Sequence, residues 1–186
     1  KRLALPSIVL LVAFVGAVFI GVLSMGSGPL GMAPGRTLLA GTAASIAAVF
    51  HWKRFHVPIT VAAGAAALVA ITLSLRELQA PDSLADHPAV VFLPLGLAVF
   101  GLAMWFDSSD LQRRTRRTDI AFWLHLLAAP LIVHPILMPV VKGDPSVASA
   151  AMVIAVFVVL AIVALVVDRR AILVSSLFYL GYAAST

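Results

Sequence analysis

Five histidines are the residues of this sequence best suited to binding a metal or moving a proton. His125 and His134 lie in the stretch AFWLHLLAAPLIVHP, residues 121 to 135, which is otherwise apolar. A neutral imidazole can ligate a metal ion, and its charge changes near neutral pH. An imidazole in an apolar setting needs a hydrogen-bond partner, so each of the two is expected to face protein or water.

The spacing of His125 and His134 separates them on a helix. Nine residues place them on opposite faces and ~13 Å apart along the axis. They therefore cannot share one metal ion or one proton. From the expected depths, His125 is predicted to lie near His51 and His56, and His134 is predicted to lie near His87 at the other end of the molecule.

The histidines are also candidate ligands for a cofactor. Three imidazoles at a similar depth can hold a divalent metal, and two can be the axial ligands of haem b. His51, His56 and His125 are the candidate cofactor ligands, and His87 and His134 complete the candidate metal ligands. A hydrogen bond between helices explains His125 and His134 more simply, so no cofactor is predicted and haem or metal is the minority hypothesis.

A third role is a path for a proton or a small solute. Trp123, Pro130 and His134 fall on one stripe of a straight helix. Pro130, Pro135 and Pro139 each remove a backbone hydrogen bond, and irregular backbone at membrane depth must be satisfied by protein or water. If any segment lines a cavity, this one is predicted to do so, although a packed and bent helix is the favoured alternative.

The composition places these residues in a membrane protein. Hydrophobic residues make up 62% of the chain and charged residues 11%, too little polar surface for a water-soluble globule of 186 residues. The apolar residues form continuous blocks rather than alternating strands, which indicates an all-α transmembrane bundle and not a barrel. The net charge of +5 is therefore assigned to membrane topology, and no nucleic-acid partner is predicted.

About seven spans are predicted, with the N-terminus in the cytoplasm. The spans are Leu3–Ser24, Thr37–Phe50, Val57–Leu75, Pro88–Phe106, Ile120–Val141, Ala150–Val167 and residue 171 to the end. Residues 1–186 are interpreted as one transmembrane domain, and as a portion of a longer chain, because the sequence starts without Met and ends at an apolar block. Asp119 is predicted to cap the helix that begins at Ile120.

The basic residues determine the predicted orientation. Ten of the 13 lie on one side of the predicted bundle: Lys1, Arg2, Lys53, Arg54, Arg113, Arg114, Arg116, Arg117, Arg169 and Arg170. The other side has Arg36, Arg76 and Lys142. Cytoplasmic loops are richer in Lys and Arg, so the first set is predicted to be cytoplasmic. Arg113, Arg114, Arg116 and Arg117 are the predicted contacts for anionic headgroups or a partner.

Small residues suggest where two helices pack closely. The second and third predicted spans carry stripes four residues apart, at Ala40, Ala44 and Ala48 and at Ala62, Ala66 and Ala70, with Gly41 and Gly64 beside them. Small residues let helix backbones approach in lipid. The two spans are therefore predicted to form a tight hairpin around the turn FHWKRFH, the alternative being a thin-walled path for a small solute.

The runs RRTRRTDIAFWLHLLAAPLIVHP and DRRAILVSSLFYLGYA resemble stretches of uncharacterised polytopic inner-membrane proteins of Gram-negative bacteria, of the DUF2157 kind. The resemblance implies a multi-pass protein of the bacterial inner membrane and a chain with more residues upstream. It implies no activity.

The predicted function is non-catalytic. The sequence has no HExxH, GxSxG, GxGxxG or phosphate loop, and its acidic residues all lie in connectors or at span ends. A membrane subunit, scaffold or sensor domain is predicted, with the lipid bilayer and other membrane subunits as partners. The alternatives are a channel or facilitator for a small solute, and a haem- or metal-binding electron-transfer subunit.

Overall fold

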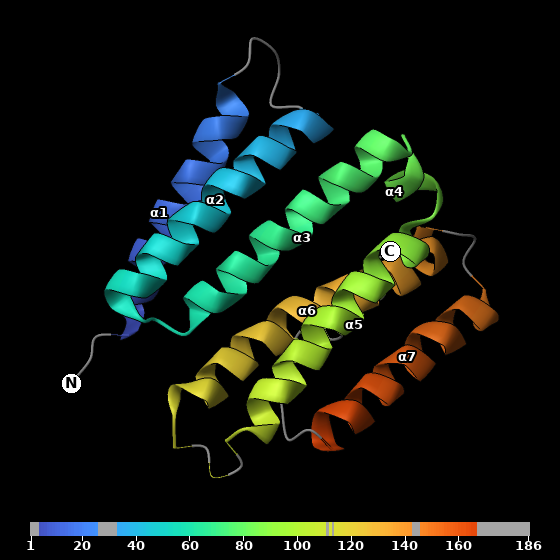
Figure 1. Cartoon of the computed structure of the whole chain (residues 1–186). Coiled ribbons are helices and arrows are strands. Elements are labelled where there is room, and N and C mark those ends of the chain that lie inside the picture. The colour runs from blue at the N-terminus through green and yellow to red at the C-terminus, as the bar shows by residue number, and fades with distance from the viewer. Residues whose placement is uncertain (1–3, 26–32, 111, 113, 143–145, 167–186) are drawn as a thin grey trace.

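The protein is all-helical over the residues that the structure describes. The computed structural model describes residues 4–25, 33–110, 112, 114–142 and 146–166. These residues form seven helices and no strand (Figure 1). The helices are α1 (Ala4–Ser24), α2 (Pro34–Phe55), α3 (Ile59–Gln79), α4 (Ser83–Asp86), α5 (Pro88–Ser108), α6 (Arg116–Lys142) and α7 (Val147–Val166). The predicted all-α class is confirmed.

Six of the seven predicted spans coincide with long helices, namely α1, α2, α3, α5, α6 and α7. The seventh, from residue 171, lies outside the described residues. Within the described part, three helices are long and apolar enough to cross a membrane: Ile59–Gln79, Pro88–Ser108 and Arg116–Met138. Shorter apolar helices cover Ile8–Ser24 and Val147–Ile162.

The predicted turn FHWKRFH is wrong, because most of it belongs to α2. The helix continues to Phe55, and His56 closes it in the left-handed conformation, with φ 52°. Lys53 and Arg54 favour the last helical turn, where positive charge offsets the helix dipole. Pro58 then disfavours further helix in the residue before it, so the chain turns within three residues.

The predicted cap at Asp119 is also wrong, since α6 begins at Arg116 and Asp119 lies in its first turn. Thr115 precedes the helix instead, and its hydroxyl accepts the backbone N–H of Arg117 at 3.2 Å. The same hydroxyl donates to Asp110 Oδ2 at 2.6 Å. The start of α6 is therefore set by Thr115, a polar capping residue four positions before the predicted cap at Asp119.

The bundle contains two closely packed helix pairs. In the pair α2 and α3, a methyl group added to Gly41 would lie 2.9 Å from Ile71 Cγ1 and 3.2 Å from the carbonyl oxygen of Ala67. In the pair α5 and α6, a methyl added to Gly96 would lie 3.1 Å from the backbone nitrogen of Ile132. The predicted tight packing of the second and third spans is confirmed at Gly41.

The two pairs meet where α3 packs on α6, and the outer helices join at either side (Figure 1). One core cluster is shared by α3, α5 and α6 and consists of Ala62, Val69, Val99, Ala103, Ile120, Leu124 and Ala128. A second joins α1 to α2 and α3 through Leu11, Val15, Ala44, Ala47, Ala48 and Ala67. α7 packs on α6 through Val133, Leu137 and Val153.

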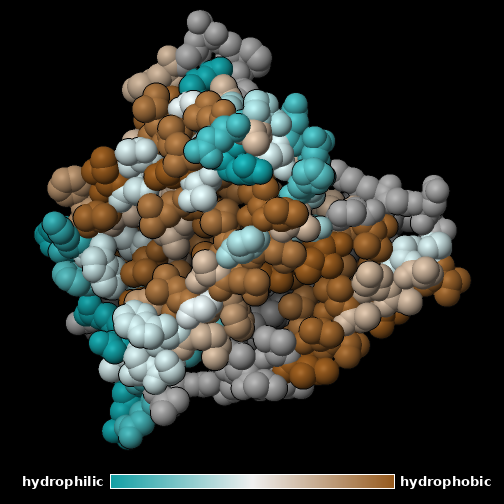
Figure 2. Space-filling view, turned by 45° about the vertical axis from the view of Figure 1, so that its right-hand side comes forward, coloured by the Kyte–Doolittle hydropathy of each residue, from teal (hydrophilic) through white to brown (hydrophobic). Residues whose placement is uncertain are grey.

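The polar connectors lie at the ends of the bundle. The start of α1, the turn from α2 to α3 and the connector from α5 to α6 lie toward one end (Figure 1). Figure 2 shows an apolar surface over much of one face, with hydrophilic residues mainly toward its edges. This is the distribution that a helical bundle needs in order to sit in a bilayer with its connectors in water.

Candidate functional site

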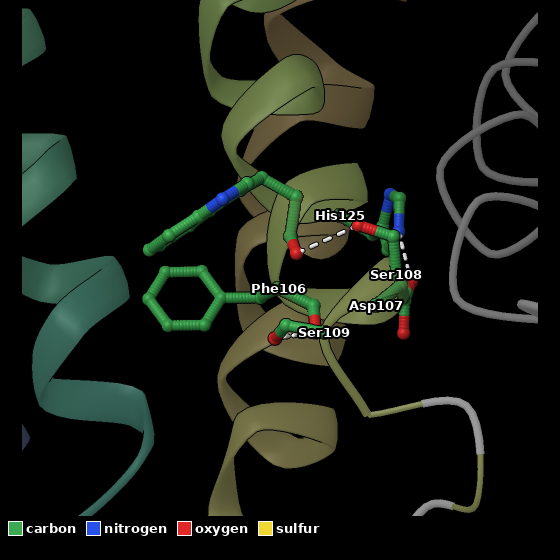
Figure 3. Close-up of polar contacts among 6 residues, drawn as sticks. Phe106, Asp107, Ser108, Ser109 and His125 are labelled. Atoms are coloured by element: carbon green, nitrogen blue, oxygen red, sulfur yellow. Dashed lines mark hydrogen bonds and ion pairs between the residues drawn. The ribbon is translucent and has the colours of Figure 1, made fainter.

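The most buried titratable group in the described part is His125, in the third turn of α6. Its side chain is 0% exposed, and its Nε2 lies 2.8 Å from Oδ2 of Asp107 near the end of α5 (Figure 3). The Asp107 side chain is 18% exposed. The ring of Phe100 meets the imidazole edge-on, with ring centroids 5.2 Å apart. A hydrogen bond therefore links α5 to α6 within an otherwise apolar contact between the two helices.

The chemistry of this pair is that of a positioned imidazole. When the Asp107 carboxylate is ionised it can only accept, and Nε2 of His125 then carries the proton that joins the two residues. A hydrogen bond with a charged partner is stronger than a neutral one, and it offsets the free energy needed to bury the ring. The pair therefore ties α5 to α6 at the end of the bundle where their connector lies.

His51 is the second buried histidine, and it ties α2 to α3. The residue is 5% exposed, and its Nδ1 lies 3.0 Å from Oγ1 of Thr60, which is 2% exposed. Its ring also contacts two aromatic rings, at 4.8 Å from Phe55 and 6.5 Å from Phe14 between centroids. Each of the two closely packed helix pairs thus carries one buried histidine with a polar partner on the adjoining helix.

The other three histidines are exposed. His56 ends α2, with its ring 5.5 Å from that of Trp52, His87 lies between α4 and α5, and His134 lies on α6. The described residues include no group of three or more metal-ligating side chains. The expected convergence of His51, His56 and His125 into one cluster is therefore not found there, since His51 bonds to Thr60 and His125 to Asp107.

Sequence reasoning does not identify Asp107 as the partner of His125, because it places every acidic residue in a connector or at the end of a span. Asp107 lies one residue before the end of α5, whereas His125 lies nine residues after the start of α6, so the antiparallel pairing of the two helices does not by itself predict that they meet. The opposite-face prediction for His125 and His134 agrees with the structure, in which the first is buried and the second exposed.

A large apolar groove lies between α1, α3 and α6. It has a volume of about 510 Å³. Its lining is apolar: Leu11, Val12, Val15, Gly16, Phe19, Ala44, Ile59, Ala62, Ala63, Ala66, Ala67, Ala70, Trp123, Leu126, Leu127 and Pro130. Two members of the predicted solute path, Trp123 and Pro130, line this groove, whereas His134 is not among the lining residues. The Ala62, Ala66 and Ala70 stripe faces the groove.

The connector from α5 to α6 is organised by Asp110. Its carboxylate accepts the hydroxyl and the backbone N–H of Thr115, at 2.6 and 2.7 Å, and the hydroxyl of Thr118 at 3.0 Å. The backbone N–H of Arg114 donates to its other oxygen at 3.2 Å. These bonds, led by that of the Thr115 hydroxyl, lower the pKa of Asp110 to about 2. The carboxylate therefore holds the connector in one shape at neutral pH.

Exposed basic residues gather around this connector and the nearby turn from α2 to α3. We call Lys53, Arg54, Arg114, Arg116 and Arg117 the basic rim. One contact joins its two parts, since Nη1 of Arg116 donates to the carbonyl oxygen of His56 at 3.4 Å. Arg113, the remaining predicted lipid contact, lies outside the described residues.

Comparison with protein-family models, curated proteins and solved structures finds no match for the chain. The resemblance to DUF2157 proteins therefore stays a prediction. The described features that bear on function are the two buried histidine pairs, the apolar groove and the basic rim.

Proposed function

We propose that this chain is a non-catalytic, multi-pass protein of the bacterial inner membrane, a membrane-embedded subunit or scaffold that binds an apolar ligand between its helices. The observation that carries the proposal is the groove between α1, α3 and α6, whose lining contains no charged side chain among the described residues. A concave apolar surface of this kind binds an apolar group well, and it offers no acid, base or nucleophile for chemistry.

The buried histidines support a binding role over a catalytic one. Neither His51 nor His125 lines the groove, and each is hydrogen-bonded to a neighbouring helix. These hydrogen bonds hold α3 to α2 and α6 to α5, and α3 and α6 form two walls of the groove. A helix pair fixed in this way keeps a groove open without a ligand, as a scaffold must do.

The groove also favours binding over solute conduction. A path for ions or polar solutes needs hydrogen-bonding groups or charged rings along its walls. Among the groove residues on α6, Trp123 has one indole N–H as its polar group, while Leu126, Leu127 and Pro130 have apolar side chains. The facilitator hypothesis is therefore the second candidate, supported by the position of Trp123 and Pro130.

Reconstitution into liposomes tests the proposed function against this second candidate. Proteoliposomes are assayed for proton leak with a trapped pH dye and for glycerol entry by light scattering. Binding without conduction predicts the rates of protein-free vesicles. A faster rate that disappears in Ala66→Trp, which fills the groove, would overturn the proposal in favour of a facilitator.

A further inference from the structure

We infer that the groove holds one acyl chain of an anionic phospholipid, drawn from the leaflet next to the basic rim, with the headgroup against Arg116 and Arg117. This inference rests on the proposed membrane location and names the ligand class. It follows from three properties of the groove: the chemistry of its walls, its length and the charge at one of its ends.

The walls match a hydrocarbon chain. The α3 wall presents the small side chains of Ala62, Ala66 and Ala70, which leave room beside the helix, and Trp123 and Leu127 supply the bulk of the α6 wall. A narrow, flexible chain fills a channel of this kind without hydrogen bonds. A helix is a cylinder about 10 Å wide, so it needs a wider space than a single hydrocarbon chain does.

The length of the groove matches one leaflet. On α3 its lining extends from Ile59 to Ala70, roughly 16 Å at about 1.5 Å per residue. The hydrocarbon core of a bilayer is ~30 Å thick, so the groove extends through about half of it. A lipid from the leaflet at the start of α3 would therefore fill the groove with one chain.

The charge at one end matches an anionic headgroup. Ile59 begins the groove on α3, and it follows the turn whose residue His56 is hydrogen-bonded to Arg116. Arg116 and Arg117 are both exposed in the first turn of α6, one to two turns before Trp123. The described acids near this end of the bundle are Asp107, Asp110 and Asp119, which are fewer than the five basic residues of the basic rim, so the net charge there is positive.

The same charges argue against a second copy of the chain as the occupant. Copies inserted with one topology present their basic rims at the same membrane surface. Bringing two such rims together sets like charges side by side, which is unfavourable, whereas an anionic lipid neutralises them.

Quenching of Trp123 fluorescence by brominated acyl chains tests the inference. The variant Trp52→Phe/Trp105→Phe leaves Trp123 alone, and Trp52→Phe/Trp123→Phe leaves the surface residue Trp105, which is 60% exposed. Each protein is reconstituted into phosphatidylcholine vesicles containing brominated phosphatidylglycerol or brominated phosphatidylcholine at equal mole fraction. We expect at least twofold stronger quenching of Trp123 by the anionic lipid, and equal quenching of Trp105 by the two lipids.

Two variants locate the effect. Arg116→Gln/Arg117→Gln is expected to remove the lipid preference at Trp123, and Ala66→Leu is expected to reduce its quenching by both lipids. Equal quenching of Trp123 by the two lipids in the parent protein overturns the inference, as does an unchanged preference in the arginine variant. Quenching of Trp105 alone also overturns it and favours a protein occupant. If neither tryptophan is quenched, the membrane location itself is wrong.

Discussion

A fully buried imidazole persists in this bundle because Asp107 accepts its hydrogen bond from the next helix. The sequence predicts the need for such a partner from the apolar surroundings of His125. It does not identify the partner, because the depth of Asp107 depends on where α5 ends and how the connector folds. Asp107 lies one residue before the last residue of α5, so a small error in the helix boundary hides the pair.

We predict a favourable coupling between Asp107 and His125. Asp107→Ala and His125→Ala each remove one partner, and the double variant removes both. The free energy of unfolding in detergent, measured for the four proteins, is expected to give a coupling of about 1 to 3 kcal/mol. Additive losses would show that the hydrogen bond contributes nothing to stability.

Asp110 gives a second prediction, with a defined pH dependence. Its folded pKa is about 2, below the usual 3.8, so its contribution to stability is present above about pH 4 and is lost as the pH falls through about 2. Asp110→Asn is therefore expected to lower the melting temperature at neutral pH, with a gap from the parent that narrows in acid.

Asp119→Asn is the matched control for Asp110→Asn, since Asp119 is exposed in the first turn of α6. It is expected to have a much smaller effect at neutral pH. An equal loss in the two variants would contradict the assignment of the cap to Asp110 and Thr115.

At the scale of the helices, hydropathy predicts which segments are helical, while local chemistry sets where they begin and end. The apolar block of α2 stops near Phe50, but the helix extends to Phe55 because charged and aromatic residues also form helix. The α6 helix continues through Pro130 and Pro135, although each proline removes one backbone hydrogen bond. A single stripe of small residues does not show which of them contact a neighbouring helix and which line a groove. That division depends on the third helix at the junction, α6.

Two glycines of α5 provide a matched test of helix packing. A methyl at Gly96 would lie 2.7 Å from Ile132 Cγ1 and 3.1 Å from backbone atoms of Leu131 and Ile132, whereas nothing lies within 4 Å of the same position at Gly101. Gly96→Ala is expected to cost about 1 to 3 kcal/mol of stability by forcing α5 and α6 apart.

Gly101→Ala is expected to be neutral or to stabilise α5 by up to about 1 kcal/mol, through helix propensity. Thermal unfolding in the same detergent compares the two variants. If Gly96→Ala were as stable as Gly101→Ala, the close approach of α5 and α6 at this position would be wrong.

For the whole molecule, the proposed function and the lipid inference both require a bundle that crosses the inner membrane with the basic rim in the cytoplasm. Charge counting predicts this orientation from the sequence, and the fold places the α2–α3 turn and the α5–α6 connector toward one end (Figure 1). The groove was not predictable, since it is formed by helices α1, α3 and α6, which are distant in the sequence.

The sidedness of two engineered cysteines tests directly whether the helices cross the membrane, and the sequence has no cysteine of its own that would be labelled. Gln112→Cys lies in the α5–α6 connector and Asp86→Cys lies at the end of α4, both exposed. A membrane-impermeant maleimide is expected to label Gln112→Cys only in inverted vesicles and Asp86→Cys only in intact spheroplasts. Labelling of both positions from the same side would contradict the membrane-spanning bundle.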